Sequence, residues 1–149
     1  MSGPIRILVM GLPGSGKTTL AEQIVLDLKL RCRSVDWFNA DEVRKLHDDW
    51  DFSIEGRIRQ AYRMRNAIDL SDSEFCIVDF IAPLKVMRQI IDADIVVWLD
   101  TIKEGRYEDT NALFERPTKV GVDFQFTEKD AESQSKIILA EIFEHCSRR

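Results

Sequence analysis

The chain has 149 residues, of which 44% are hydrophobic and 32% are charged, which fits one domain with a substantial hydrophobic core. Its formal net charge of −5 argues against a nonspecific nucleic-acid binder, which usually needs a basic surface. We find no signal peptide and no apolar run near the roughly 20 residues that span a bilayer. The thiols Cys32, Cys76 and Cys146 lack metal-site spacing, so we expect a reduced, cytoplasmic protein without membrane contact, forming one domain over residues 1–149.

The first predicted elements enclose a glycine-rich loop. Residues 5–10 are nearly all apolar, as in a central parallel strand, and residues 17–29 have the periodicity of an amphipathic helix. The chain between them follows the P-loop pattern, in which glycines let the backbone approach a phosphate and the helix N-terminus supplies partial positive charge. We therefore expect ATP to bind to Gly11, Leu12, Pro13, Gly14, Ser15, Gly16, Lys17, Thr18 and Thr19.

Three side chains near this loop suit phosphoryl transfer. Lys17 adds a full positive charge near the β- and γ-phosphates, and the Thr18 hydroxyl can ligate Mg²⁺. Residues 34–38 are a predicted second strand, and residues 39–42 form a polar turn that opens a short helix through about residue 47. Asp41 follows that strand, where a carboxylate can accept the proton of an attacking hydroxyl, although Asp is also a good helix N-cap. Arg44, one helical turn further on, could reach an anionic group of the substrate.

A longer helix is predicted over residues 54–70, with Ser53 as its N-cap. Its apolar stripe also contains Arg57 and Arg65, which must be paired or must border a polar cavity. We expect Arg57, near the helix start, to face an anionic substrate, and Arg65 to form a structural ion pair. The stripe consists of Ile54, Ile58, Ala61 and Ile68, and the opposite face carries Arg59 and Arg63, which would suit a larger anionic substrate.

The remaining elements complete an alternating pattern. Strands are predicted at residues 75–80, 94–99 and 120–126, and helices at residues 84–91 and from residue 127, the last with Ile137, Ile138, Ile142 and Phe143 on its inner face. Alternating strands and helices indicate an α/β fold with a doubly wound parallel five-stranded sheet, a three-layer sandwich like that of P-loop NTPases and nucleotide kinases. Ligands of such sheets bind at the carboxyl ends of the strands.

Two further features lie at that edge of the predicted sheet. Asp79 ends the third strand and is a candidate Mg²⁺ ligand with Thr18, while Asp100 ends the fourth and is assigned a structural role. Residues 101–118 are polar, irregular and long for a connection, which is typical of a mobile lid over an active site. Arg106 is the first candidate to neutralise phosphate charge when this lid closes, and Arg116 is the second.

Several stretches between residues 5 and 101 resemble adenylylsulfate kinases (APS kinases), small P-loop kinases that phosphorylate the 3′-hydroxyl of adenosine 5′-phosphosulfate. Residues 39–44 read Asn-Ala-Asp-Glu-Val-Arg, where the family has Asp-Gly-Asp-Asn-Val-Arg. Residues 51–60 read Asp-Phe-Ser-Ile-Glu-Gly-Arg-Ile-Arg-Gln, similar to Gly-Phe-Ser-x-Glu-Asp-Arg-x-x-Asn. Residues 80–83 read Phe-Ile-Ala-Pro for Phe-Ile-Ser-Pro, and residues 99–101 read Leu-Asp-Thr for Val-Asp-Thr.

The resemblance implies roles for the matched residues. Asp41 would activate the acceptor hydroxyl, Phe52 would stack on the substrate base, and Arg44 and Arg57 would hold its anionic group. By the same resemblance the acceptor would also be lined by Gln60, Ile81, Ala82 and Pro83. The chain departs from the family at Gln60, where the family has Asn, and at Ala82, where it has Ser. The lid also carries acids in place of lysines, and the family's Phe-Thr-Gly after the lid is missing.

We therefore predict an ATP- and Mg²⁺-dependent kinase that moves the γ-phosphoryl group to an alcohol, with Lys17 and Asp41 as catalytic residues and a small-molecule nucleotide as acceptor. Adenosine 5′-phosphosulfate is the first choice of acceptor. The alternatives are another hydroxyl, in a nucleoside, a polynucleotide 5′-end or a modified DNA base, and a nucleotide-binding regulator without transfer activity. Nucleic acid is not favoured as a partner, and a homodimer is left open.

Overall fold

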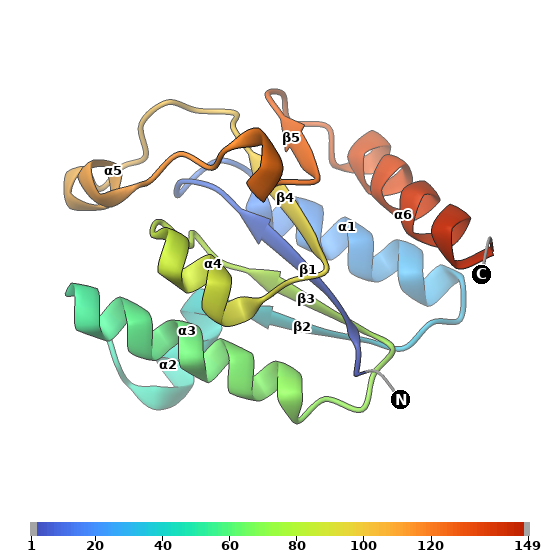
Figure 1. The fold of residues 1–149 in the computed structure, drawn as a ribbon, viewed down its shortest axis with the longest axis horizontal. Helices are drawn as coiled ribbons and strands as arrows, with labels where there is room; N and C mark the ends of the chain where they lie inside the picture. The colour runs from blue at the N-terminus through green and yellow to red at the C-terminus, as the bar shows by residue number, and fades with distance from the viewer. Residues whose placement is uncertain (1–2, 148–149) are drawn as a thin grey trace.

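The computed structural model describes residues 3–147, with side chains described up to residue 144, so the Cys146 side chain lies outside the described part. Its sheet has the strand order β2-β3-β1-β4-β5, and each neighbouring pair is parallel (Figure 1). The strands are β1 (Ile5–Met10), β2 (Val35–Asn39), β3 (Phe75–Asp79), β4 (Ile95–Leu99) and β5 (Phe124–Phe126). The helices are α1 (Lys17–Leu30), α2 (Ala40–His47), α3 (Ile54–Asp69), α4 (Lys85–Ile91), α5 (Glu108–Leu113) and α6 (Ala131–Ser147), with a short 3₁₀ turn η1 (Lys119–Gly121).

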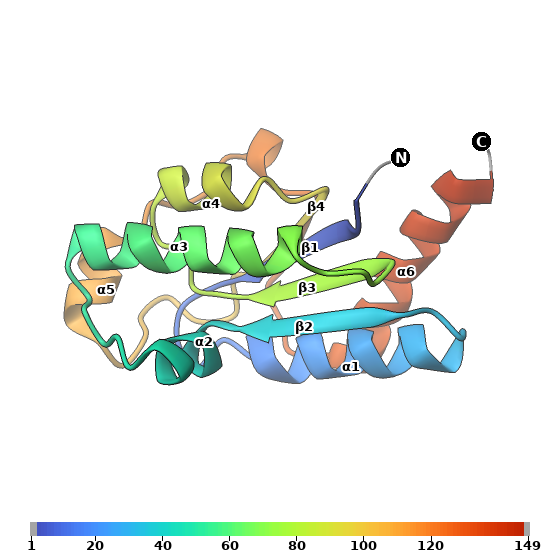
Figure 2. The same cartoon turned by 90° about the horizontal axis from the view of Figure 1, so that it is seen from below.

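The helices form two layers around the sheet, which confirms the predicted three-layer α/β sandwich. Figure 2 shows α1 on one face and α3 and α4 on the other, and α6 packs beside α1. Successive side chains of a strand point to opposite faces. Ile7 and Val9 of β1 therefore enter the core under α1 and α6, while Leu8 and Met10 pack with α3 and α4, and all four are fully buried.

The parallel register fixes which residues meet at the carboxyl edge of the sheet. Val9 of β1 and Asn39 of β2 both lie opposite Asp79 of β3. The loop after β1 and the start of α2 therefore lie on either side of Asp79, as the ligand-binding edge of a doubly wound sheet requires.

The second half of the chain differs from the expectations in three places. The segment 101–118 is not irregular throughout, because it contains α5. The strand predicted over residues 120–126 is only β5, since residues 119–121 form η1. Ile137 was assigned to the inner face of the last helix but is 50% exposed, whereas Ile138, Leu139 and Ile142 are buried there. Among the helices of the described residues, none is both long and apolar enough to cross a membrane.

Candidate active site

The loop between β1 and α1 has the backbone shape of a phosphate-binding loop. Gly14 and Gly16 have φ angles of +89° and +102°, in the left-handed region that favours glycine. Gly11 is required for another reason, because a Cβ there would lie 2.7 Å from the Leu99 carbonyl oxygen and 2.6 Å from Ser15 Oγ. The P-loop can therefore pack against the end of β4 and lead into the N-terminus of α1 only with glycine at this position.

Lys17 lies at the centre of a group of charges brought together by four segments. Its Nζ donates to the Leu12 carbonyl at 3.2 Å, within the loop. Burial lowers the pKa of Lys17, the nearby carboxylates of Asp79 and Asp41 oppose that shift, and the positive charge of Arg106 adds to it. These long-range interactions place Lys17, Asp41, Asp79 and Arg106, all expected site residues, around one region.

Asp79 is held at the sheet edge by two hydrogen bonds on one oxygen. Thr18 Oγ1 donates to its Oδ2 at 2.9 Å, and Asn39 Nδ2 donates to the same oxygen at 2.8 Å. Burial raises the pKa of Asp79, while these hydrogen bonds and the charge of Lys17 counteract the shift. A hydroxyl and a carboxylate so close together fit Mg²⁺, a cation that prefers oxygen ligands and is usually held by one or two side chains together with phosphates.

The residues expected to hold the acceptor include an aromatic ring that contacts two buried arginines. Phe52 is 47% exposed, and the guanidinium carbons of Arg44 and Arg57 lie 4.3 Å and 5.5 Å from its ring centroid. Arg44 Nη1 donates to the carbonyls of Asp49 and Asp51, each at 3.1 Å, which fixes the loop that carries Phe52. Both arginines are only 4% exposed, so their guanidinium groups are held against the Phe52 ring rather than in solvent.

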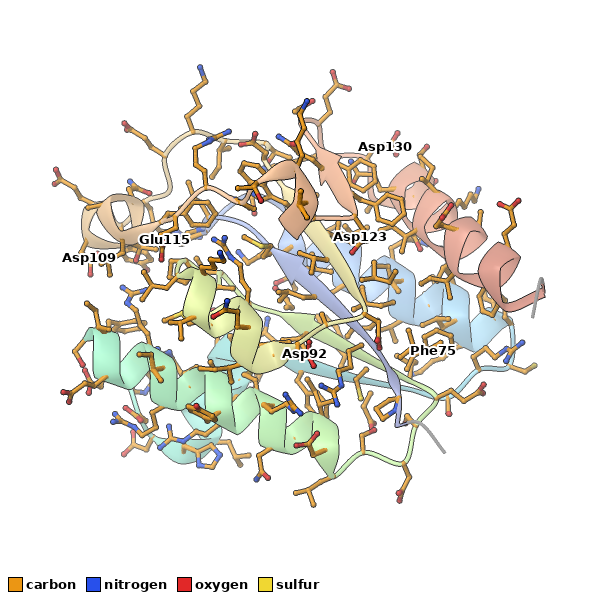
Figure 3. The ribbon with its side chains drawn as sticks, viewed as in Figure 1. Phe75, Asp92, Asp109, Glu115, Asp123 and Asp130 are labelled. Atoms are coloured by element: carbon orange, nitrogen blue, oxygen red, sulfur yellow. The ribbon has the colours of Figure 1, made fainter. Side chains whose placement is uncertain are left out.

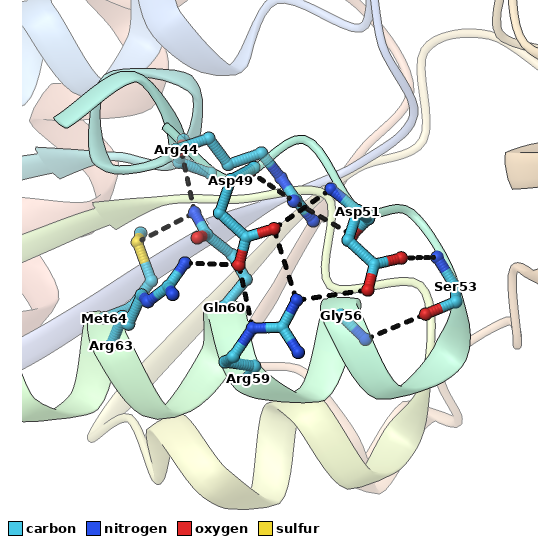
Figure 4. A network of polar contacts seen from close by, with 10 residues as sticks. Arg44, Asp49, Asp51, Ser53, Gly56, Arg59, Gln60, Arg63 and Met64 are labelled. Atoms are coloured by element: carbon cyan, nitrogen blue, oxygen red, sulfur yellow. Dashed lines mark hydrogen bonds and ion pairs between the residues drawn. The ribbon is translucent and has the colours of Figure 1, made fainter. Parts of the chain in front are cut away.

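A network of acids and arginines supports that loop from below (Figure 4). Asp49 accepts from Arg59 Nε at 2.8 Å and from Arg63 Nη1 at 2.7 Å, and Asp51 pairs with Arg59 Nη2 at 3.1 Å. The hydrogen bond from Arg59 is the largest cause of the lowered pKa of Asp49. Arg59 and Arg63, which were expected to suit a larger anionic substrate, are therefore engaged in positioning the loop that precedes α3.

The other residues assigned to the acceptor are mostly buried. Gln60 is fully buried and donates through Nε2 to the Ala40 carbonyl at 2.8 Å, and its Oε1 has no partner among the described residues. Ala82 is also fully buried and has a φ of +47°, while Ile81 is partly exposed. Arg88, which sequence reasoning did not single out, donates to the Ala82 carbonyl at 2.9 Å and to the Pro83 carbonyl at 3.3 Å.

The predicted lid contacts both halves of the site. Thr101 Oγ1 donates to the carbonyl of Ser15, a residue of the P-loop, at 2.8 Å. On the acceptor side, Thr110 Oγ1 of α5 accepts from Arg57 Nη2 at 3.2 Å. Arg116 is paired with Asp100 at 3.2 Å, so the structure uses this second phosphate candidate in an ion pair at the end of β4. Asp100 thus has the structural role expected for it.

Arg65 also has the structural role expected for it. Its Nε is 3.2 Å from Asp69 Oδ1 one turn along α3, and its Nη1 donates to the Ile90 carbonyl of α4 at 2.9 Å. The bond to Ile90 joins α3 to α4, while the ion pair with Asp69 lies within α3.

A family model, a relative and several solved structures that are similar to this chain are all kinases. A family model described as adenylylsulphate kinase matches residues 3–131. Cytidine diphosphoramidate kinase of Campylobacter jejuni is 26% identical over 148 aligned residues, which cover 88% of this chain and 85% of that protein. An APS kinase from Mycobacterium tuberculosis, solved with AMPPNP and APS, has a TM-score of 0.74 at 18% identity, with coverage of 94% of this chain and 98% of that one. Shikimate kinase from Acinetobacter baumannii has a TM-score of 0.63 at 17% identity, with coverage of 95% and 94%.

The solved structures share the fold of a P-loop kinase, and the family match contains the P-loop, α2, α3 and all five strands. With this match over most of its length, the chain belongs to the adenylylsulphate kinase family and is an ATP-dependent kinase.

Proposed function

We propose that the protein transfers the γ-phosphoryl group of ATP to a ribose hydroxyl of a small nucleotide, as one kinase domain with residues 101–118 as its lid. One observation carries the proposal. The P-loop, with Lys17 and the nearby Asp41, lies close to the Phe52 ring and its two arginines, since the charge of Asp41 acts on both Lys17 and Arg44. The first group suits a triphosphate, and the second suits a base and an anionic tail.

The chain's own residues supply the main elements of phosphoryl transfer. Lys17 and the loop N–H groups hold the phosphates, and Arg106 adds positive charge from the lid. Mg²⁺, held by Thr18 and Asp79, would neutralise charge on the transferred group when bound. Asp41 orients the acceptor hydroxyl and takes its proton as the new oxygen–phosphorus bond forms, while the bond from the γ-phosphorus to the bridging oxygen breaks and ADP leaves.

Two acceptors follow from the comparisons. Family membership favours the 3′-hydroxyl of adenosine 5′-phosphosulfate. The relative from Campylobacter jejuni favours a nucleotide of the cytidine diphosphoramidate kind. The departures of this chain from the APS kinase pattern, Gln60, Ala82 and the acidic residues of the segment 101–118, weigh against adenosine 5′-phosphosulfate as the acceptor.

The test is an assay of ATP consumption with a set of acceptors. It should include adenosine 5′-phosphosulfate, cytidine diphosphoramidate, plain nucleosides and DNA 5′-ends. We expect turnover with at least one of the two modified nucleotides and none with DNA ends. Turnover with DNA ends alone would contradict the proposal.

The assigned base has its own test in Asp41→Asn. We expect this variant to bind ATP normally and to lose at least about a hundredfold in kcat, since general base catalysis contributes about 10²–10⁴. Isothermal titration with ATP and initial-rate kinetics measure the two quantities. A variant that keeps the full transfer rate would show that Asp41 is not the base.

A further inference from the structure

The guanidinium group of Arg57 has an acidic neighbour on the lid. Asp109 Oδ2 of α5 lies 3.6 Å from Arg57 Nη2, and within the described part of the chain it is the only carboxylate in ion-pair range of Arg57. Figure 3 shows Asp109 on α5, next to the start of α3. Arg57 Nε is already bonded to the Phe52 carbonyl at 2.8 Å, and none of the hydrogen bonds of the described residues uses Nη1. Nη1 is therefore the nitrogen of Arg57 left for a ligand, and it belongs to the same guanidinium group as Nη2, which lies 3.6 Å from Asp109 Oδ2.

This pair contributes little to folding. The Asp109 side chain is 71% exposed, and ion pairs with such an exposed partner are largely screened by water. The hydroxyl of Thr110, which is buried, already accepts a hydrogen bond from the same Nη2. The Asp109 carboxylate is therefore not needed as a hydrogen-bond acceptor for Arg57, and its charge, which acts on Arg57, also acts on any group that binds beside that arginine.

The chemistry of a ligand group that binds beside Arg57 can be deduced from its two neighbours, the Arg57 guanidinium and the Asp109 carboxylate. Phosphate and sulfate oxygens accept hydrogen bonds from Arg57, but they carry negative charge and repel a carboxylate a few ångströms away. A terminal group with both an acidic oxygen and an N–H satisfies both neighbours, because the oxygen accepts from Arg57 and the N–H donates to Asp109.

We propose that Asp109 is a specificity-determining residue that favours acceptor nucleotides whose terminal group carries an N–H donor, such as a phosphoramidate, over those that end in phosphate or sulfate. This inference rests on the proposed function, since it concerns the acceptor of that same transfer.

The experiment compares acceptors that differ in the terminal group alone. CDP is paired with cytidine diphosphoramidate, and adenosine 5′-phosphosulfate with adenosine diphosphoramidate, each with saturating ATP and Mg²⁺. kcat and KM are measured for the wild type, Asp109→Asn and Glu108→Gln. Glu108 is the matched control, because it precedes Asp109 on α5, is exposed, and forms no ion pair with the described residues.

We expect the wild type to prefer the amidate in both pairs. Asp109→Asn should reduce that preference on the order of fivefold to tenfold, the effect of one screened charge at about 4 Å, mainly through the KM of the acceptor. The KM for ATP should stay unchanged, and Glu108→Gln should keep the wild-type preference.

An equal preference in the wild type and in Asp109→Asn, or equal shifts in the two variants, would overturn the inference while leaving the proposed kinase activity in place. Failure of the wild type to phosphorylate any of the four nucleotides would instead overturn the proposed function, and the inference with it.

Discussion

Gly11 shows how one residue can decide whether the donor site forms. The Leu99 carbonyl at the end of β4 lies where its side chain would begin, at 2.7 Å from an added Cβ, and a backbone carbonyl cannot turn away as a flexible side chain can. Gly11→Ala should therefore separate the P-loop from β4. We expect a loss of about 2 kcal/mol in the free energy of unfolding, in the range of other overpacked sites, and ATP binding at least about tenfold weaker.

Urea unfolding and ATP titration of the same samples measure both effects. Gly3→Ala is the control, because nothing lies within 4 Å of the Cβ position at Gly3 and its φ is not positive. If Gly11→Ala matched Gly3→Ala in both measurements, the close packing of the loop against β4 would be wrong.

The sequence indicated that Arg57 needs polar partners, because it lies on an apolar helical stripe, but it could not identify them. The structure has Arg57 4% exposed, whereas the side chain of Arg65 on the same stripe is 34% exposed. The hydrogen-bond partner of Arg57, Thr110, is 53 positions away, in a segment without apolar periodicity, so no local pattern indicates the contact. The role of Arg88 could not be predicted either, because its hydrogen-bond acceptors are backbone carbonyls of a loop rather than side chains with a recognisable pattern.

Among the secondary-structure elements, those with apolar periodicity were predictable and α5 was not. The four longer strands and most helices agree with the predicted ranges within a few residues. Helix α5 has one buried residue, Thr110, so it has no apolar stripe to reveal it. Local hydrogen bonds help to hold the segment instead, including a mutual pair in which Gly105 N donates to Asn111 Oδ1 at 2.7 Å and Asn111 Nδ2 donates to the Gly105 carbonyl at 3.0 Å.

That amide pair gives a prediction for the lid element. Asn111→Ala removes both bonds between Gly105 and α5, so this segment should open locally more often while the sheet keeps its packing. We expect amide hydrogens of residues 102–113 to exchange at least about fivefold faster, a change of about 1 kcal/mol in local opening, from the loss of two hydrogen bonds. Hydrogen exchange followed by mass spectrometry resolves the lid from the core.

The control for this prediction is Asn66→Ala, an exposed position on α3 whose side chain makes no hydrogen bond among the described residues. Its exchange pattern should match the wild type throughout. Unchanged protection of residues 102–113 in Asn111→Ala would mean that the Gly105–Asn111 pair does not hold the lid.

At the scale of the whole molecule, the parallel sheet brings residues that are far apart in the sequence together in one site. The register places Asn39 and Val9 on either side of Asp79, so residues from three strands meet without any local signal in the sequence beyond strand ends. The site's position was predictable because the carboxyl edge of such a sheet is its binding edge. The bounds of the last strand were harder to predict, because the apolar alternation of residues 120–126 extends beyond the three residues of the edge strand β5.

Because the candidate site is formed by residues from several strands of one sheet, a ligand that binds there stabilises the whole folded domain. The rise in Tm therefore measures ligand binding. A ligand at a hundred times its Kd adds about 2.7 kcal/mol, which raises the Tm of a domain of this size by roughly 5–10 °C. We expect ATP with Mg²⁺ to give such a shift, and ATP with EDTA to give a clearly smaller one.

Thr18→Val keeps the side-chain shape but removes the hydroxyl next to Asp79, so the Mg²⁺-dependent part of the shift should disappear while the part from ATP alone persists. Differential scanning calorimetry with the exposed-site variant Thr127→Val as control measures both parts, and a full Mg²⁺-dependent shift in Thr18→Val would exclude this hydroxyl as a ligand.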